Sequence, residues 1–163
     1  WQPLIQGGVQ EGGQRAGRLH PALVAALGLT AAAASRHLVA RARAAEQLRK
    51  DLLEACSRRI SGLMTPFQGA DRLPGHLLMM IPGVEGESLL ADLRRDGIEA
   101  DSGSSCMDGP GVTSRVLRAS GLSQDEARSS LILRLSSSLS RGVVEAVAGS
   151  LATSVARLRA LAP

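Results

Sequence analysis

The near absence of aromatic side chains is the feature that most constrains how this chain can fold. Trp1 and Phe67 are the only aromatic residues among 163, and there is no tyrosine. Hydrophobic residues still make up 44% of the chain and charged residues 21%, which is the balance of a globular protein rather than of a disordered one. We therefore expect a core built from aliphatic side chains and methionine. The length predicts one domain, or a large part of one.

The charge pattern and the cysteine content exclude several classes of function. The net charge is +4, yet along Arg41–Arg59 the basic residues alternate with acidic ones, which is typical of a solvated helix face. Single-stranded nucleic acids are bound largely by aromatic stacking, so we expect no direct nucleic-acid partner. Two cysteines, Cys56 and Cys106, are too few for a disulfide framework and indicate a cytoplasmic protein.

No segment is expected to cross a membrane. The longest apolar runs, Ala22–Ala34 and Leu77–Ile81, are shorter than the roughly 20 residues that a spanning helix needs. The first residues contain neither a basic region nor the apolar core of a signal peptide. Because the chain also lacks an initiator methionine, we interpret it as a fragment of a longer protein.

Apolar spacing and turn residues predict helices mixed with a few short strands. A glycine-rich loop is expected over residues 1–20, followed by a long helix from Pro21 to about Ile60. Strands are predicted at His76–Ile81, Ile98–Ala100 and Leu131–Leu135. Further helices are predicted at Gly86–Arg95, at Val112–Ser120, after the capping residue Ser123, and at Val143–Leu161. The predicted class is an α/β or α+β fold with helices packed on a small sheet.

Cys106 is the first candidate for chemistry. It lies in the segment Asp101–Gly111, whose serine and glycine residues favour a mobile loop with an accessible thiol. Asp101 and Asp108 would not promote formation of a thiolate, so activation would have to come from elsewhere. Free cysteines are more often buried hydrophobic residues than nucleophiles, and Cys56, near the apolar face of a helix, fits that reading.

Other chemistry has weaker support in the sequence. His20, His37 and His76 form no metal-ligand spacing with one another or with a cysteine, so no metal site is expected. The glycine-rich start matches neither the dinucleotide-binding nor the Walker fingerprint. Lys50 is the only lysine and hence the only candidate for a lysine Schiff base.

Three segments, in this order, resemble the C-terminal part of the cysteine desulfurases, which are pyridoxal-phosphate enzymes of the class V aminotransferase group. Gly7–Gly17 resembles the family's Gly-Gly-Gly-x-Glu-Arg-Gly-x-Arg-x-Gly segment, and Gly83–Leu90 resembles the segment before the helix that leads to the catalytic loop. Ser102–Cys106 together with Val116–Gly121 resembles that loop and the helix after it. The resemblance extends from about Pro3 to Leu161.

The resemblance implies the C-terminal domain of a fold-type I pyridoxal-phosphate enzyme. Residues 1–35 would be the end of the large cofactor domain, with a glycine-rich loop facing the other subunit of a homodimer. Residues 36–163 would be the small domain, with the mobile cysteine loop at 101–111. The implied reaction converts L-cysteine to L-alanine and leaves the sulfur as a persulfide on Cys106. The sulfur would then pass to an acceptor such as an iron–sulfur scaffold or a tRNA-thiolation protein.

The same resemblance suggests binding residues, with departures from the family pattern. Arg134 is the candidate for the substrate carboxylate, although an ungapped match puts the family arginine at Ile132. Arg18 stands where the family commonly has a threonine that reaches the cofactor phosphate across the dimer. The family's Schiff-base lysine precedes the glycine-rich segment and has no counterpart here, so we expect this chain alone to be inactive.

Two alternatives remain open at this point. The chain could belong to a selenocysteine lyase-like or another class V enzyme. It could also be a non-catalytic module that binds a desulfurase or a scaffold protein. A Schiff-base lysine motif upstream in the full reading frame would favour an enzyme over the module.

Overall fold

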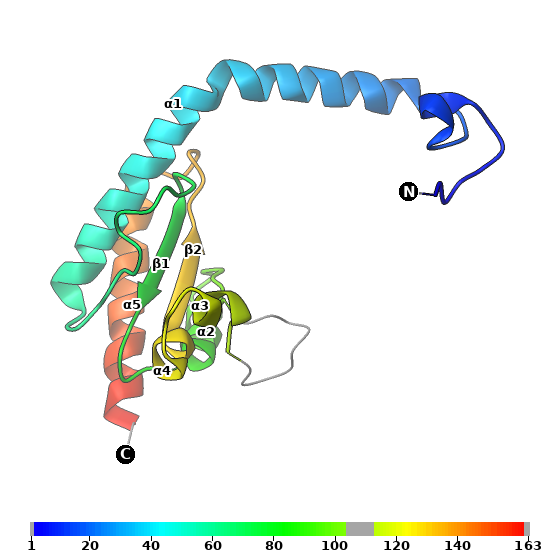
Figure 1. Cartoon of the computed structure of the whole chain (residues 1–163). Helices are drawn as coiled ribbons and strands as arrows, with labels where there is room; N and C mark the ends of the chain where they lie inside the picture. The colour runs from blue at the N-terminus through cyan, green and yellow to red at the C-terminus, as the bar shows by residue number, and fades with distance from the viewer. Residues whose placement is uncertain (1, 104–112, 162–163) are drawn as a thin grey trace. The chain divides into compact units, whose positions relative to one another are not determined.

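The computed structural model describes residues 2–103 and 113–161 of the chain. Its contacts divide the chain between Val39 and Ala40 into two compact units, which we call unit 1 (Trp1–Val39) and unit 2 (Ala40–Pro163). Figure 1 shows the order of the elements along the chain. The predicted division at residues 35 and 36 into parts of two enzyme domains stays a prediction.

Unit 1 consists of a loop and the first part of helix α1 (Pro21–Arg59). The loop contains a short 3-10 helix, η1 (Gln10–Gly13), and it is held by a hydrogen bond from the Gly17 amide to the side-chain oxygen of Gln10 (3.2 Å). Pro21 opens α1, where a missing backbone N–H costs nothing. Through Ser35 the helix carries no charged residue, and its leucine and valine side chains in this part are exposed.

The expectation that no segment could cross a membrane is wrong by length and composition. Helix α1 contains an 18-residue window with a mean hydropathy of 1.5 and at most two charged residues. The apolar run Ala22–Ala34 is too short by itself, but helix α1 continues beyond it to Arg59, and a spanning window tolerates a few polar residues. One helix of this kind is weak evidence, since core helices and signal sequences have the same length and composition.

Unit 2 is built around a two-stranded antiparallel sheet. Strand β1 (His76–Met80) pairs with β2 (Ser130–Arg134) in a register that runs from His76 opposite Arg134 to Met80 opposite Ser130. Both strands were predicted. The prediction of a strand at Ile98–Ala100 is wrong, because these residues form no ladder with another strand. The chain pairs with β2 only at the next residue, through an isolated bridge between Asp101 and Ile132.

The main core lies on one face of this sheet. Leu77 and Met79 of β1 and Leu131 and Leu133 of β2 are all buried in it. Against them pack the second part of α1 and the helices α2 (Gly86–Arg95) and α5 (Arg141–Leu161). The core side chains are aliphatic, methionine and one cysteine, as the lack of aromatic residues requires. The predicted fold class, helices packed on a small sheet, is confirmed.

Two short helices cover the opposite face of the sheet. Helix α3 (Arg115–Ala119) contributes Leu117 and α4 (Gln124–Arg128) contributes Ala127 to a second, smaller core. Ser123 caps α4 in a capping box, as predicted. Helix α3 begins three residues later than predicted, because the Ser114 hydroxyl accepts from the Leu117 amide (3.3 Å) and so fixes the helix start.

Candidate functional site

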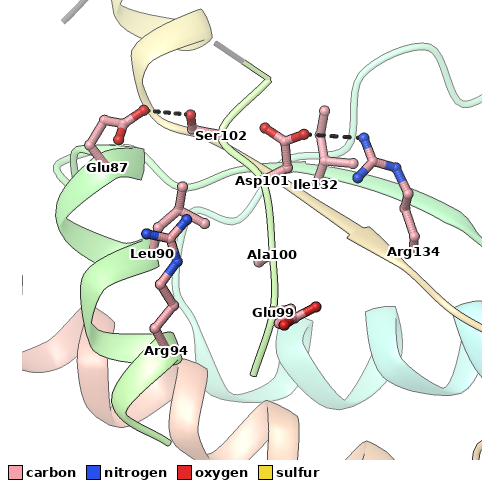
Figure 2. Close-up of a pocket in the computed structure, with 9 residues that line it drawn as sticks. All are labelled: Glu87, Leu90, Arg94, Glu99, Ala100, Asp101, Ser102, Ile132 and Arg134. Atoms are coloured by element: carbon pink, nitrogen blue, oxygen red, sulfur yellow. Dashed lines mark hydrogen bonds and ion pairs between the residues drawn. The ribbon is translucent and has the colours of Figure 1, made fainter. Parts of the chain in front are cut away.

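A cavity of about 490 Å³ opens between α2, the chain before the cysteine loop and β2. Its size lies within the range of small-molecule sites. Three carboxylates and two guanidinium groups line it together with apolar and hydroxyl side chains. Figure 2 shows these lining residues, which are Glu87, Leu90, Arg94, Glu99, Ala100, Asp101, Ser102, Ile132 and Arg134.

Arg134, the candidate for binding a substrate carboxylate, lies at the end of β2 and lines this cavity. Ile132, the position of the family arginine in an ungapped match, lines the same cavity. Residues two apart on a strand project from the same face, which explains why both side chains reach one space. The Arg134 side chain is 69% exposed, and its Nη2 lies 3.1 Å from Oδ2 of Asp101. Its guanidinium group is therefore accessible from solvent but already has a carboxylate partner.

Asp101 is held more firmly than its partner. Its backbone is bridged to Ile132 by two hydrogen bonds, with N···O distances of 3.0 and 2.6 Å. Its Oδ1 accepts a hydrogen bond from the Gly103 amide at 2.9 Å, while Oδ2 faces Arg134. The Asp101 carboxylate thus contacts both the end of β2, through Arg134, and the start of the predicted cysteine loop, through Gly103.

Ser102 and Gly103 continue this anchored segment. The Ser102 hydroxyl donates to Oε1 of Glu87 at 2.7 Å, and its carbonyl accepts from the buried Ser130 hydroxyl at 2.6 Å. Gly103 has a φ of +72°, and a Cβ there would lie 3.2 Å from Cδ1 of Ile132. A side chain at this position would be both strained and crowded. The residues just before Ser104 are therefore fixed against the sheet and α2.

The surroundings of His76, on the strand next to Arg134, disfavour its charged form. It lies opposite Arg134 in the register of the sheet. Partial burial, reinforced by the charges of Arg134 and Arg72, holds the pKa of His76 below its usual value. Both causes disfavour a second positive charge beside Arg134 on the adjacent strand.

Of the two cysteines, the structure describes Cys56 only. Cys56 is completely buried on α1, and burial raises the pKa of its thiol to about 11. Such a thiol is protonated and shielded near neutral pH, which makes it a poor nucleophile. Cys106 and the predicted loop beyond Gly103 lie outside the described residues, so the role of Cys106 stays a prediction.

The described residues do not fit the anchoring of pyridoxal phosphate within this chain. Lys50 is exposed on α1 and pairs with Glu46, its Nζ lying 2.8 Å from the carboxylate. That contact also lowers the pKa of Glu46. The cavity beside Arg134 is lined by no lysine. These residues therefore support no chemical step through the cofactor within this chain.

The described parts of the chain contain no cluster of metal ligands, and Arg18 belongs to unit 1. Arg18, the candidate for the cofactor phosphate, is exposed there. Within residues 2–103 and 113–161, no three His, Cys, Asp or Glu side chains lie close enough together to bind a metal ion. The role of Arg18 therefore stays a prediction.

Sequence reasoning missed the acidic partners of this cavity. Asp101 was considered only as a neighbour of Cys106, and Glu87 and Glu99 were not singled out. The pattern Asp101-Ser-Gly103 carried a usable signal, since aspartate often accepts a hydrogen bond from the amide two residues later. No local pattern indicates the pairing with Arg134, which is 33 residues away in the chain.

Curated proteins similar to this chain share one description. A cysteine desulfurase of Klebsiella pneumoniae is 31% identical over 163 residues, which is all of this chain and 41% of that protein. A cysteine desulfurase 2 of Trichormus variabilis is 35% identical over 167 residues, again all of this chain and 41% of that protein. No family model matches the chain. The resemblance to the cysteine desulfurases is confirmed.

This chain is also similar in fold to a solved structure. A NifS-like protein from Rickettsia africae matches 94% of this chain and 39% of its own length, with a TM-score of 0.79 and 24% identity. At that level of identity the likeness concerns the fold. This chain spans about two fifths of the length of the cysteine desulfurases it matches.

Proposed function

We propose that this chain is the sulfur-carrying part of a pyridoxal-phosphate-dependent cysteine desulfurase. In this proposal Cys106 carries the sulfur and Arg134 binds the carboxylate of L-cysteine. One observation carries it: a chain similar to cysteine desulfurases over its whole length brings Arg134 into one cavity with the residues that lead into the cysteine loop.

The proposed reaction transfers one sulfur atom from L-cysteine to Cys106. L-cysteine and the Cys106 thiol give L-alanine and a Cys106 persulfide, so the substrate's sulfur is transferred and all atoms balance. Cys106 follows Gly103 by three residues, a length of at most about 11 Å of extended chain. The segment Asp101–Gly103 is anchored to β2 and α2, and it gives this short connection a fixed starting point.

Arg134 suits a carboxylate ligand better than a lysine would. Its planar guanidinium group can donate two parallel hydrogen bonds to one carboxylate. Among the described residues, its Nη2 pairs with Asp101, and its side chain lines the cavity and is 69% exposed. A ligand carboxylate would thus be oriented at the end of β2, next to the start of the cysteine loop.

The rest of the function belongs to the longer protein of this proposal. Carbon–sulfur cleavage needs the electron sink that pyridoxal phosphate supplies, and a lysine outside these 163 residues would hold the cofactor. We further propose a cytoplasmic homodimer in which Arg18 contacts the cofactor phosphate of the other subunit. The persulfide would pass to an acceptor protein, such as an iron–sulfur scaffold or a tRNA-thiolation protein.

The test uses the complete protein encoded by the reading frame that contains this chain. L-alanine release from L-cysteine is measured for the parent protein and for Cys106→Ser and Cys56→Ser. We expect Cys106→Ser to reduce L-alanine release to background while cofactor absorbance is retained, because the cofactor anchors lie elsewhere. Cys56→Ser controls for the loss of a thiol as such and should keep the activity. Undiminished L-alanine release by Cys106→Ser would overturn the proposal.

A further inference from the structure

We propose that Asp101 is an internal competitor for the carboxylate ligand of Arg134 and thereby sets the affinity of the cavity beside Arg134. This inference rests on the proposed function, since it takes Arg134 to be the carboxylate-binding group. It assigns to Asp101 a part in ligand affinity that neither the sequence motifs nor the similarity to cysteine desulfurases indicates.

The geometry favours competition over simple support of Arg134. Asp101 Oδ2 lies 3.1 Å from Arg134 Nη2, within the distance of a charge-assisted hydrogen bond. A ligand carboxylate on the same guanidinium group must either displace this oxygen or bind beside a second negative charge. Both routes weaken ligand binding, because like charges close together repel one another.

Asp101 is also a preorganised competitor. The double backbone bridge to Ile132 and the hydrogen bond from the Gly103 amide to Oδ1 fix its carboxylate before any ligand arrives. Arg134, in contrast, is a long, largely exposed side chain that can reorient. The pair therefore forms by movement of Arg134 toward a fixed acceptor, and the ordering cost falls on one side chain only.

A second carboxylate in the cavity allows the effect of Asp101 on Arg134 to be distinguished from a general change in the charge of the cavity. Glu99 lines the same cavity, and within the described residues the carboxylate that pairs with Arg134 is that of Asp101. Removing either carboxylate changes the charge of the cavity by the same amount. Of these two substitutions, only the removal of Asp101 breaks an ion pair with Arg134.

The size of the effect follows from exposure. Arg134 is largely exposed and Asp101 more than one third exposed, and such ion pairs are weak. Removing the competing charge should therefore tighten carboxylate binding by only about two- to five-fold. Asp101→Asn is the appropriate substitution, because the asparagine side-chain oxygen can still accept the hydrogen bond from the Gly103 amide and keep the start of the loop in place.

The experiment titrates L-alanine into the 163-residue chain, at concentrations where light scattering gives a monomer. The probe is the side-chain Nε–Hε resonance of Arg134 in chain labelled with ¹⁵N-arginine, identified by its loss in Arg134→Lys. We expect a Kd for L-alanine about two- to five-fold lower in Asp101→Asn than in the parent chain, and a smaller change in the matched control Glu99→Gln.

Three results would overturn the inference. They are an unchanged or higher Kd in Asp101→Asn, an equal effect of Glu99→Gln, and no response of the Arg134 resonance in any variant. L-alanine contains no sulfur and its binding needs no thiol, so the result is independent of whether Cys106 carries a persulfide. An Arg134 resonance that responds, with an unchanged Kd in Asp101→Asn, overturns this inference alone, whereas no response in any variant also contradicts the role of Arg134 in the proposed function.

Discussion

At the scale of single residues, the thiols of Cys56 and Cys106 are expected to differ in burial and in reactivity. Cys56 has no exposed surface, and its thiol pKa is raised to about 11 from a reference value of 9.0. In the unfolded chain this thiol loses its proton near pH 9, whereas the folded chain keeps it to about pH 11. The unfolded state therefore binds fewer protons in this window, and stability falls as the pH rises from 9 to 11.

This pH dependence is easy to measure in this chain. With no tyrosine and one lysine, few side chains other than the thiols titrate between pH 9 and 11. We expect the midpoint of urea unfolding to fall across this window in the parent chain and in Cys106→Ala, and to change much less in Cys56→Ala. Equal slopes in the two variants would show that Cys56 is not the buried titrating thiol.

At the scale of elements, Asp92 joins two helices of the main core. Its nearly buried carboxylate on α2 forms ion pairs with Arg95 of the same helix and Arg157 of α5. Because both arginines are about half or more exposed, water can solvate them when the carboxylate is removed. We expect Asp92→Ala to lower the free energy of unfolding by about 1–2 kcal/mol.

Urea denaturation at pH 7 checks this prediction. The matched control is Glu54→Ala, which breaks an ion pair with Arg58 in which both side chains are exposed. That change should cost less than about 0.5 kcal/mol, because the pair lies in water on one helix. If the two substitutions cost the same, the contact between Asp92 and Arg157 does not stabilise the packing of α2 on α5.

The elements also show which features of the fold a sequence can predict. The strand at His76–Met80 and the helix at Gly86–Arg95 follow from local apolar patterns and turn residues, and both were predicted. The strand expected at Ile98–Ala100 was wrong, because pairing depends on which segment lies beside β2 and not on the local pattern. The contact between Asp101 and Arg134 has the same origin: it exists only after the sheet has formed.

At the scale of the whole molecule, unit 1 should make the chain self-associate. Leu23, Leu27 and Leu29 on the first part of α1 are each about 70% exposed, in a stretch without charged residues. Contiguous exposed apolar surface of this kind favours association. We expect the average mass from light scattering to rise with protein concentration, and to rise much less for Leu23→Glu/Leu27→Glu.

The control for this prediction is Leu73→Glu. Leu73 is 77% exposed in the loop before β1 of unit 2, so the substitution adds a charge at an equally exposed leucine outside α1. It should leave the concentration dependence of the mass as in the parent chain. A monomer at all concentrations of the parent chain would contradict the prediction, and so would an equal effect of the control.

The central claim, that Cys106 carries the sulfur, is tested most directly by locating the sulfur after reaction. The complete protein is incubated with L-cysteine, alkylated, digested with trypsin and analysed by mass spectrometry. The two thiols fall in separate peptides, Asp96–Arg115 for Cys106 and Asp51–Arg58 for Cys56. The account predicts one extra sulfur atom on the peptide that contains Cys106 and none on the other. A persulfide on Cys56, or on neither peptide while L-alanine is released, would contradict it.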